Sequence, residues 1–196
     1  MTSHRKVTAA AVLCGFWLCG CSQQAPESAK SAGSAGTAAP AAQGPTDDPC
    51  ALVSDGAVRK AFADAKPGVR DHHLDQYKIL TCTWDTPTNT VAAQIFEAHG
   101  TVEDELRSRV SGSVDPLKPG AGAKIEYETI EGLGDESKMV AAKADPNEGI
   151  LSDAALIGIR RDKRMVVFFS RSLIDGDRAT TLKALESLGR AAAGRI

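Results

Sequence analysis

The sequence predicts an α+β domain: an antiparallel sheet of about six to seven strands, with three helices packed mainly on one face and one disulfide within the domain. Three observations lead to this fold class. Strand-like runs alternate with short turn-forming segments, three segments carry apolar residues at helical spacing, and two cysteines remain in the globular region. Short connections between strands favour hairpins over crossovers, which is typical of α+β domains.

The first half of the globular region reads as one helix followed by strands. Ser54 and Asp55 can cap a helix that ends at Pro67-Gly68. Its apolar face would be Val58, Ala61, Phe62 and Ala65. An irregular strand is expected within residues 69–77, and regular strands at 79–85 and 91–98. Pro87-Thr88-Asn89 supplies turn chemistry between the last two, which therefore form a hairpin.

The second half repeats the order of helix and strands and ends in a helix. Thr101 and Asp104 resemble a capping box, followed by Val102, Leu106 and Val110 at four-residue spacing. Strand-like runs follow at residues 123–130, 137–144, 154–160 and 164–170, with spacing that suits a meander. A final amphipathic helix starts near Asp175-Gly176-Asp177, and its apolar residues are Ala179, Leu182, Leu185, Leu188 and Ala192.

The N-terminus has the pattern of a lipoprotein signal peptide over residues 1–20. Arg5 and Lys6 precede an apolar run that is too short to span about 30 Å of hydrocarbon. The run ends in Leu18-Cys19-Gly20-Cys21, which looks like a lipobox. That resemblance implies cleavage before Cys21 and a diacylglycerol on its thiol. We therefore expect export by the general secretory route and a lipid anchor on the outer face of the cell membrane. The alternative is an ordinary signal peptide with incidental cysteines.

Residues 22–46, which follow the expected lipidated Cys21, predict a disordered tether. They are dominated by Ala, Ser, Gly, Pro and Gln and contain no apolar residue larger than Ala. Such a stretch cannot bury enough surface to offset its ordering entropy, and as a random coil it spans about 25–30 Å. Residues 47–196 have mixed composition and the size of a single globular domain.

Cysteine usage predicts one disulfide. Cys14 and Cys19 lie in the signal peptide and Cys21 is the lipidation candidate, which leaves Cys50 and Cys82 in an oxidising compartment. The alternatives are two free thiols or a two-cysteine metal site. Two cysteines 32 residues apart lack the close pairing of a zinc site.

Charge argues against one class of partner. The formal net charge of −2 becomes −4 once Arg5 and Lys6 are removed with the signal peptide. A mildly acidic chain offers no basic footprint for nucleic acid, and contact with anionic membrane through a polybasic patch is not expected.

Three local patterns occur in order along the globular region: Asp48-Pro49-Cys50, Cys82-Thr83-Trp84 and Gly132-Leu133-Gly134-Asp135-Glu136-Ser137. In this the chain resembles the actinobacterial lipoproteins described as domain of unknown function 3558. More distantly it is similar to extracellular sensor domains of mycobacterial-type Ser/Thr kinases. Ser137 departs from the alanine frequent at that place. The resemblance implies an envelope binding or sensing module and transfers no catalytic residues.

No contiguous catalytic motif is present. Asp71-His72-His73-Leu74-Asp75 has metal-ligand residue types, but neighbouring histidines on a strand point to opposite faces, so a solvated edge or loop is favoured. A third ligand would have to come from elsewhere, for example His99. Gly120–Lys124 lacks the ending of a P-loop, and the Gly132/Gly134 motif is favoured as a structural turn over a ligand loop. Arg160-Arg161-Asp162-Lys163-Arg164 reads as a hairpin turn, with contact to anionic wall polymer or phospholipid as the alternative.

We therefore expect a cell-surface lipoprotein that acts without catalysis, without a metal and without a cofactor, and that binds an envelope protein or a small apolar or cell-wall ligand. One alternative is a cell-wall or ester hydrolase whose catalytic groups are not contiguous in sequence, with His73 or His99 beside a nucleophile. Another is a structural or antagonist surface protein. A concave, apolar, uncovered sheet face would favour a small ligand, and a flat one would favour a protein partner.

Overall fold

The computed structural model describes residues 44–111, 125–147 and 149–196. The helices are α1 (Asp55–Ala61), α2 (Val102–Val110) and α3 (Arg178–Ala192). The strands are β1 (Val69–Asp71), β2 (Leu80–Asp85), β3 (Thr90–Glu97), β4 (Glu128–Thr129), β5 (Glu136–Ala142), β6 (Ala154–Arg161) and β7 (Arg164–Ser170). None of the described helices is long and apolar enough to cross a membrane.

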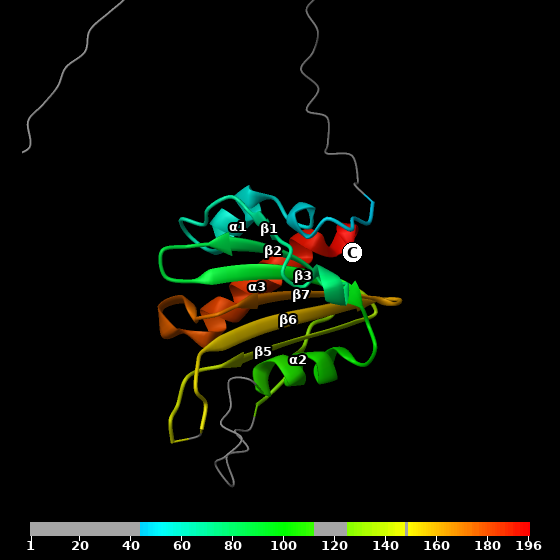
Figure 1. Cartoon of the computed structure of the whole chain (residues 1–196). Helices are drawn as coiled ribbons and strands as arrows, with labels where there is room; N and C mark the ends of the chain where they lie inside the picture. Colours follow the sequence, from blue (N-terminus) through cyan, green and yellow to red (C-terminus); the bar gives the residue numbers. More distant parts are fainter. Residues whose placement is uncertain (1–43, 112–124, 148) are drawn as a thin grey trace, which may run out of the picture. The chain divides into compact units, whose positions relative to one another are not determined.

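One seven-stranded sheet forms the centre of the domain, in the order β1-β2-β3-β7-β6-β5-β4 (Figure 1). Every neighbouring pair is antiparallel. Two meanders, β1-β2-β3 and β4-β5-β6-β7, meet where β3 pairs with β7, with Ala93 opposite Phe168. This confirms the predicted α+β class and the predicted hairpin between β2 and β3.

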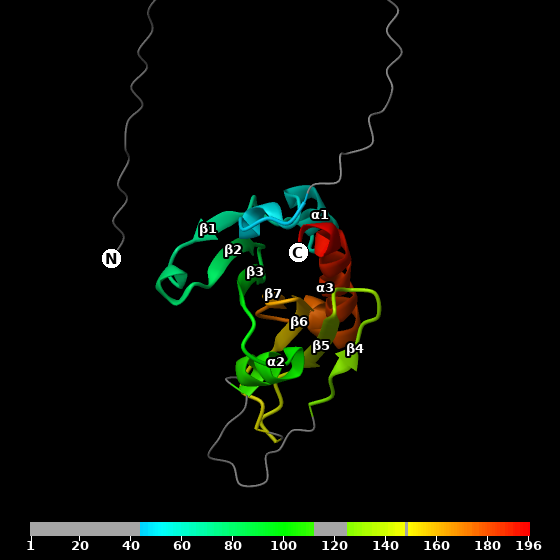
Figure 2. The same ribbon diagram turned by 90° about the vertical axis from the view of Figure 1, so that its right-hand side faces the viewer.

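The helices divide between the two faces of the sheet (Figure 2). Helix α3 lies on one face against β5, β6 and β7 and also contacts α1, so two of the three helices share a face as predicted. Helix α2 packs on the opposite face against β5 and β6. Gly158 of β6 permits this approach, because a Cβ there would lie 2.6 Å from Cγ1 of Val102. Each face has its own cluster of buried apolar residues, so the described domain carries its own hydrophobic core.

Side-chain caps start the helices where the sequence indicated. Ser54 accepts a hydrogen bond from the Ala57 amide, and Thr101 accepts one from Asp104. Asp177 accepts one from the Thr180 amide and begins α3. The first helix is shorter than expected, since it ends at Ala61 and the chain is already extended at Phe62.

Two predicted strands are much shorter than expected. In the segment 69–77 only β1 is a strand, because side chains there bind the local backbone and each other. Asp71 accepts a hydrogen bond from the His73 amide, and the chain then enters a 3₁₀ turn at Asp75–Tyr77. In the segment 123–130 only β4 pairs with β5. Residues 123 and 124, and most of the loop expected at 111–122, lie outside the described residues.

The disulfide between Cys50 and Cys82 is present, with 5.1 Å between the two Cα atoms. Trp84, fully buried two residues further along β2, donates through Nε1 to Oδ1 of Asp55 at 2.9 Å. The same oxygen accepts from the Gly68 amide at 2.9 Å. A Cβ on Gly68 would lie 2.6 Å from Nε1 of Trp84, so only glycine fits there. We call these five residues the staple junction; it holds the N-terminal segment, α1 and β2 together.

Opening the disulfide should destabilise the domain. The bond closes a loop between residues 32 apart in sequence, which in the chain-entropy model stabilises the fold by about 3–4 kcal/mol. Urea unfolding of the protein with and without reductant measures the loss. The variant Cys50→Ala/Cys82→Ala should have the same lowered urea midpoint as the reduced protein, and reductant should not change it. An unchanged urea midpoint after reduction would contradict the assignment of this bond as a main stabiliser.

The staple junction also predicts a pH dependence of stability. Hydrogen bonds from the Gly68 amide and then from the Trp84 indole lower the pKa of Asp55. The carboxylate therefore stabilises the fold above its unfolded pKa of about 4, and this contribution is lost as the pH falls through the lower folded pKa. Between about pH 5 and pH 2, the free energy of unfolding should fall more steeply in the unchanged protein than in Asp55→Asn. The variant Asp64→Asn, at an exposed position, serves as the control. Its free energy of unfolding should fall with pH as steeply as that of the unchanged protein.

Candidate functional site

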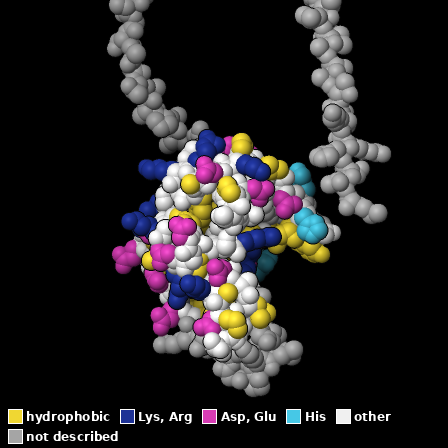
Figure 3. Space-filling view, turned by 90° about the vertical axis from the view of Figure 1, so that its left-hand side faces the viewer, with side chains coloured by type: hydrophobic (Ala, Val, Ile, Leu, Met, Phe, Trp, Pro, Cys, Tyr) yellow, Lys and Arg dark blue, Asp and Glu magenta, His cyan; other side chains and the backbone are white. Residues whose placement is uncertain are grey.

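The face of the sheet that carries α2 has hollows at its two ends. Helix α2 stands on one side, over β5 and β6, and the connection between β1 and β2 (residues 72–79) stands on the other (Figure 2). Between them runs a groove over β3 and β7, which we call the α2-side groove. The space-filling view shows a hollow on this side of the domain, with histidines on its upper rim and basic side chains at its wall (Figure 3).

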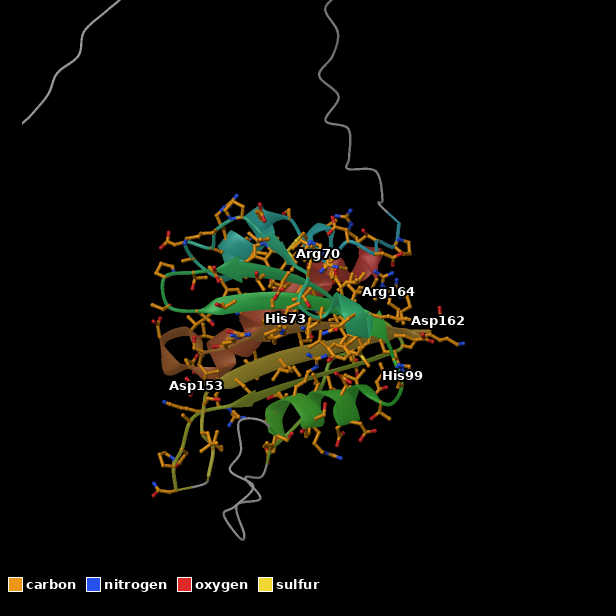
Figure 4. All side chains as sticks on the ribbon, viewed as in Figure 1. Arg70, His73, His99, Asp153, Asp162 and Arg164 are labelled. Atoms are coloured by element: carbon orange, nitrogen blue, oxygen red, sulfur yellow. A yellow bond between two sulfur atoms is a disulfide. The ribbon has the colours of Figure 1, made fainter. Side chains whose placement is uncertain are left out.

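The α2-side groove holds two hollows at opposite ends. The larger has a volume of about 440 Å³ and is lined by Arg109, Ser152, Asp153, Ala154, Leu156, Phe169, Ser170 and Arg171. The smaller has a volume of about 290 Å³ and is lined by Tyr77, Lys78, Ile79, Phe96, Glu97, His99 and Glu105. Figure 4 shows Asp153 and His99 at the two ends of this face, with His73 between them.

The strand register shows that the side chains on the floor of the groove form three rows. Ala92, Phe169 and Leu156 lie side by side at one end, and Thr81, Gln94 and Val167 lie in the middle. Phe96 and Met165 form the row at the other end. Since Ala92 and Phe96 are four residues apart on one strand, the floor spans about 13 Å.

Arg109 of α2 is fixed above the middle of this floor. Its Nε donates to Oε1 of Glu105 at 2.7 Å, and its Nη1 donates to Oε1 of Gln94 at 2.5 Å. Its guanidinium carbon lies 5.1 Å from the centre of the Phe96 ring, a cation–π contact. Three partners from two elements therefore hold one cation at the point where the two hollows approach each other.

The polar network beneath Arg109 is buried. Gln94 is 4% exposed and Thr81 is 3% exposed. Gln94 donates through Nε2 to Oγ1 of Thr81 at 3.3 Å while its oxygen accepts from Arg109. Buried polar groups are costly unless paired, so this chain of contacts favours one orientation of the guanidinium.

A third cavity, of about 520 Å³, lies at the His99 end of the sheet beside the turn between β6 and β7. Figure 4 shows Asp162 and Arg164 on that side of the domain. Leu80, Ile95, Phe96 and Ile196 give it apolar lining. At its wall Arg164 pairs with Asp47 at 2.8 Å, and Arg161 donates to the Ile196 carbonyl.

The glycine motif is a structural turn that supports the β6–β7 turn. Gly132 and Gly134 both have positive φ, and a Cβ on Gly134 would lie 2.3 Å from the Arg160 carbonyl oxygen. Asp135 accepts a hydrogen bond from the Asp162 amide at 2.6 Å. The structural interpretation of this motif is confirmed, and Arg160–Arg164 forms the predicted hairpin turn.

The histidine-containing segment forms a solvated loop, as favoured from sequence. His72 and His73 are exposed, and Nδ1 of His72 lies 2.7 Å from Oδ2 of Asp75. The hydrogen bond with His72, followed by the Arg70 contact, lowers the pKa of Asp75. Among the described residues, no group of three His, Cys, Asp or Glu side chains is placed to hold a metal ion. His99 lies in the smaller hollow, which Tyr77, Lys78 and Ile79 also line.

Of the residues singled out from sequence, Cys50 and Cys82 are joined and Cys21 lies outside the described residues. Sequence reasoning missed Gln94, Phe96, Arg109 and Phe169. One signal was available: β3 and β7 carry apolar residues on both faces, which indicates that both faces are covered or line a site. The Glu105/Arg109 pair at i,i+4 spacing was another signal, although such pairs are common on solvated helices.

No family model, curated protein or solved structure matches this chain.

The network under Arg109 gives a testable prediction. Gln94→Leu keeps the volume but removes the acceptor of Arg109 and the donor to Thr81, which should destabilise the fold by about 1–3 kcal/mol. Urea unfolding measures the loss. Gln76→Leu, at an exposed position of the β1–β2 connection, is the matched control and should change little. Equal stability of the two variants would show that the network does not hold the groove.

Proposed function

We propose that this protein is a cell-surface lipoprotein module that binds a small amphipathic ligand in the α2-side groove, without catalysing a reaction. The observation that carries the proposal is the Arg109 guanidinium, held over Phe96 between two partly apolar hollows on the sheet face that carries α2. A concave site with apolar walls and a few fixed polar groups is the usual form of a small-molecule site.

The proposed location rests on the N-terminal sequence. A signal peptide over residues 1–20, a lipidated Cys21 and a tether over residues 22–46 would hold the domain at the outer face of the cell membrane. Membership of the family described as domain of unknown function 3558 is part of the same proposal. It is supported by the three motifs that carry the resemblance, since each has a defined structural role here.

Binding is favoured over hydrolysis by the lining of the hollow that holds His99. Two carboxylates, Glu97 and Glu105, lie there with His99, but the described lining residues include no Ser, Thr or Cys. Glu105 is also engaged by Arg109. A role in capturing another protein would be favoured by a large exposed apolar patch. The described residues expose only three large apolar side chains, Val69, Tyr77 and Leu151.

A thermal-shift screen of residues 22–196 against lipids, wall fragments and metabolites tests the proposal. These residues include the whole described domain with its own core. A binding compound should raise the melting temperature of the unchanged chain, and Phe169→Ala should reduce that shift because Phe169 lines the larger hollow. Leu151→Ala, at an exposed position outside the lining of the groove, should not. A screen without hits, or hits indifferent to Phe169→Ala, would refute groove binding.

A further inference from the structure

The larger hollow of the α2-side groove carries an arginine that makes no ion pair with a described residue. Two arginines, Arg109 and Arg171, and one acid, Asp153, line it. Arg109 is paired with Glu105. Oδ1 of Asp153 accepts the Ala144 amide at 2.7 Å. Arg171 is exposed and makes no ion pair with any residue within 44–111, 125–147 or 149–196.

Apolar side chains lie directly beside these arginines. Leu156 and Phe169 face each other across β6 and β7, and both line the same hollow with Ala154. Phe169 is only partly buried by the protein itself. The hollow therefore offers an apolar wall and two guanidinium groups within one volume of about 440 Å³.

The opposite end of the groove has no comparable excess of positive charge. Glu97 and Lys78 line the smaller hollow together with Glu105, which is paired with Arg109. A negatively charged group is therefore better accommodated at the Arg171 end than at the Glu97 end. The middle row of the floor is buried, because Gln94 is 4% exposed and Arg109 lies on it, so the apolar part of a ligand has its wall at Phe169 and Leu156.

From this arrangement we infer that the ligand of the α2-side groove is an acidic amphiphile: a carboxylate or phosphate head on an apolar chain. The head lies between Arg171 and Arg109, and the chain lies against Phe169 and Leu156 in the larger hollow. Arginine suits such a head because its planar guanidinium binds carboxylate or phosphate through two parallel hydrogen bonds. The contacts with Gln94 and Glu105 orient Arg109 before the ligand arrives, which lowers the entropic cost of binding. This inference rests on the proposed function.

Two sources can supply this chemistry: a free fatty acid and a membrane phospholipid. Calorimetric titration of residues 22–196 with hexadecanoate, below the concentration at which it forms micelles, tests the first. Titration with phosphatidylglycerol vesicles, with phosphatidylcholine vesicles as the zwitterionic reference, tests the second. Hexadecan-1-ol has the same chain without the acid and measures the apolar part alone.

The variant Arg171→Gln should weaken the binding of hexadecanoate or of phosphatidylglycerol by about tenfold, the effect of one charge-assisted hydrogen bond. Arg178→Gln removes an exposed arginine outside the groove and should leave the affinity unchanged. Phe169→Ala should weaken hexadecanoate and hexadecan-1-ol alike. In spectra of ¹⁵N-labelled protein, the Nε–H signals of Arg109 and Arg171 should shift with hexadecanoate and not with hexadecan-1-ol.

Different failures separate this inference from the proposed function. If hexadecan-1-ol binds as tightly as hexadecanoate and Arg171→Gln changes neither, the acidic head is refuted, while weakening by Phe169→Ala still supports the groove. If no acidic amphiphile binds but another compound does so in a manner sensitive to Phe169→Ala, the inference fails and the proposed function stands. If nothing binds, both fail.

Discussion

The staple junction is the constraint on which the rest of the domain depends. It fixes β2 by a covalent bond at Cys82 and by a buried hydrogen bond at Trp84. Both residues point to the face that carries α3, so the alternation of a strand turns Thr81 to the other face, into the floor of the groove. A one-residue slip of β2 would exchange the two faces. The disulfide thus holds the N-terminal segment and also sets which side chains reach the candidate site.

The groove exists because the two faces of the sheet are covered unequally. Helix α3 is long and covers β5, β6 and β7 on its face, whereas α2 is short, and on its face Phe96 of β3 and Phe169 of β7 are only partly buried. Gly158 allows α2 to approach β6 closely, and Glu136 accepts a hydrogen bond from the Val102 amide at the start of α2. Lys138 and Arg107 both pair with Glu103, which adds a charged contact between α2 and β5. These contacts place Arg109, in the last turn of the helix, above Gln94 and Phe96 of β3.

The sequence predicted most of the fold because its signals are local. Ser54, Thr101 and Asp177 cap helices, and runs rich in apolar residues mark β2, β3 and β5 to β7. The segment at residues 69–77 was misjudged because its outcome depends on hydrogen bonds of Asp71 and Asp75. The candidate site could not be predicted, since Gln94 and Arg109 meet only once α2 has crossed the sheet. The motifs that stand out in sequence, around Cys50, Trp84 and Gly134, stabilise the fold. The residues that line the groove belong to no recognisable motif.

The central claim is that an amphipathic ligand lies against Phe169 in the α2-side groove. Intermolecular nuclear Overhauser effects between the chain protons of ¹³C-labelled hexadecanoate and the aromatic protons of the protein test it most directly. We expect cross-peaks to the ring of Phe169. Because Phe96 also borders the cavity of about 520 Å³, Phe169 decides between the two sites. Cross-peaks to Leu80 and Ile196 without any to Phe169 would contradict the account.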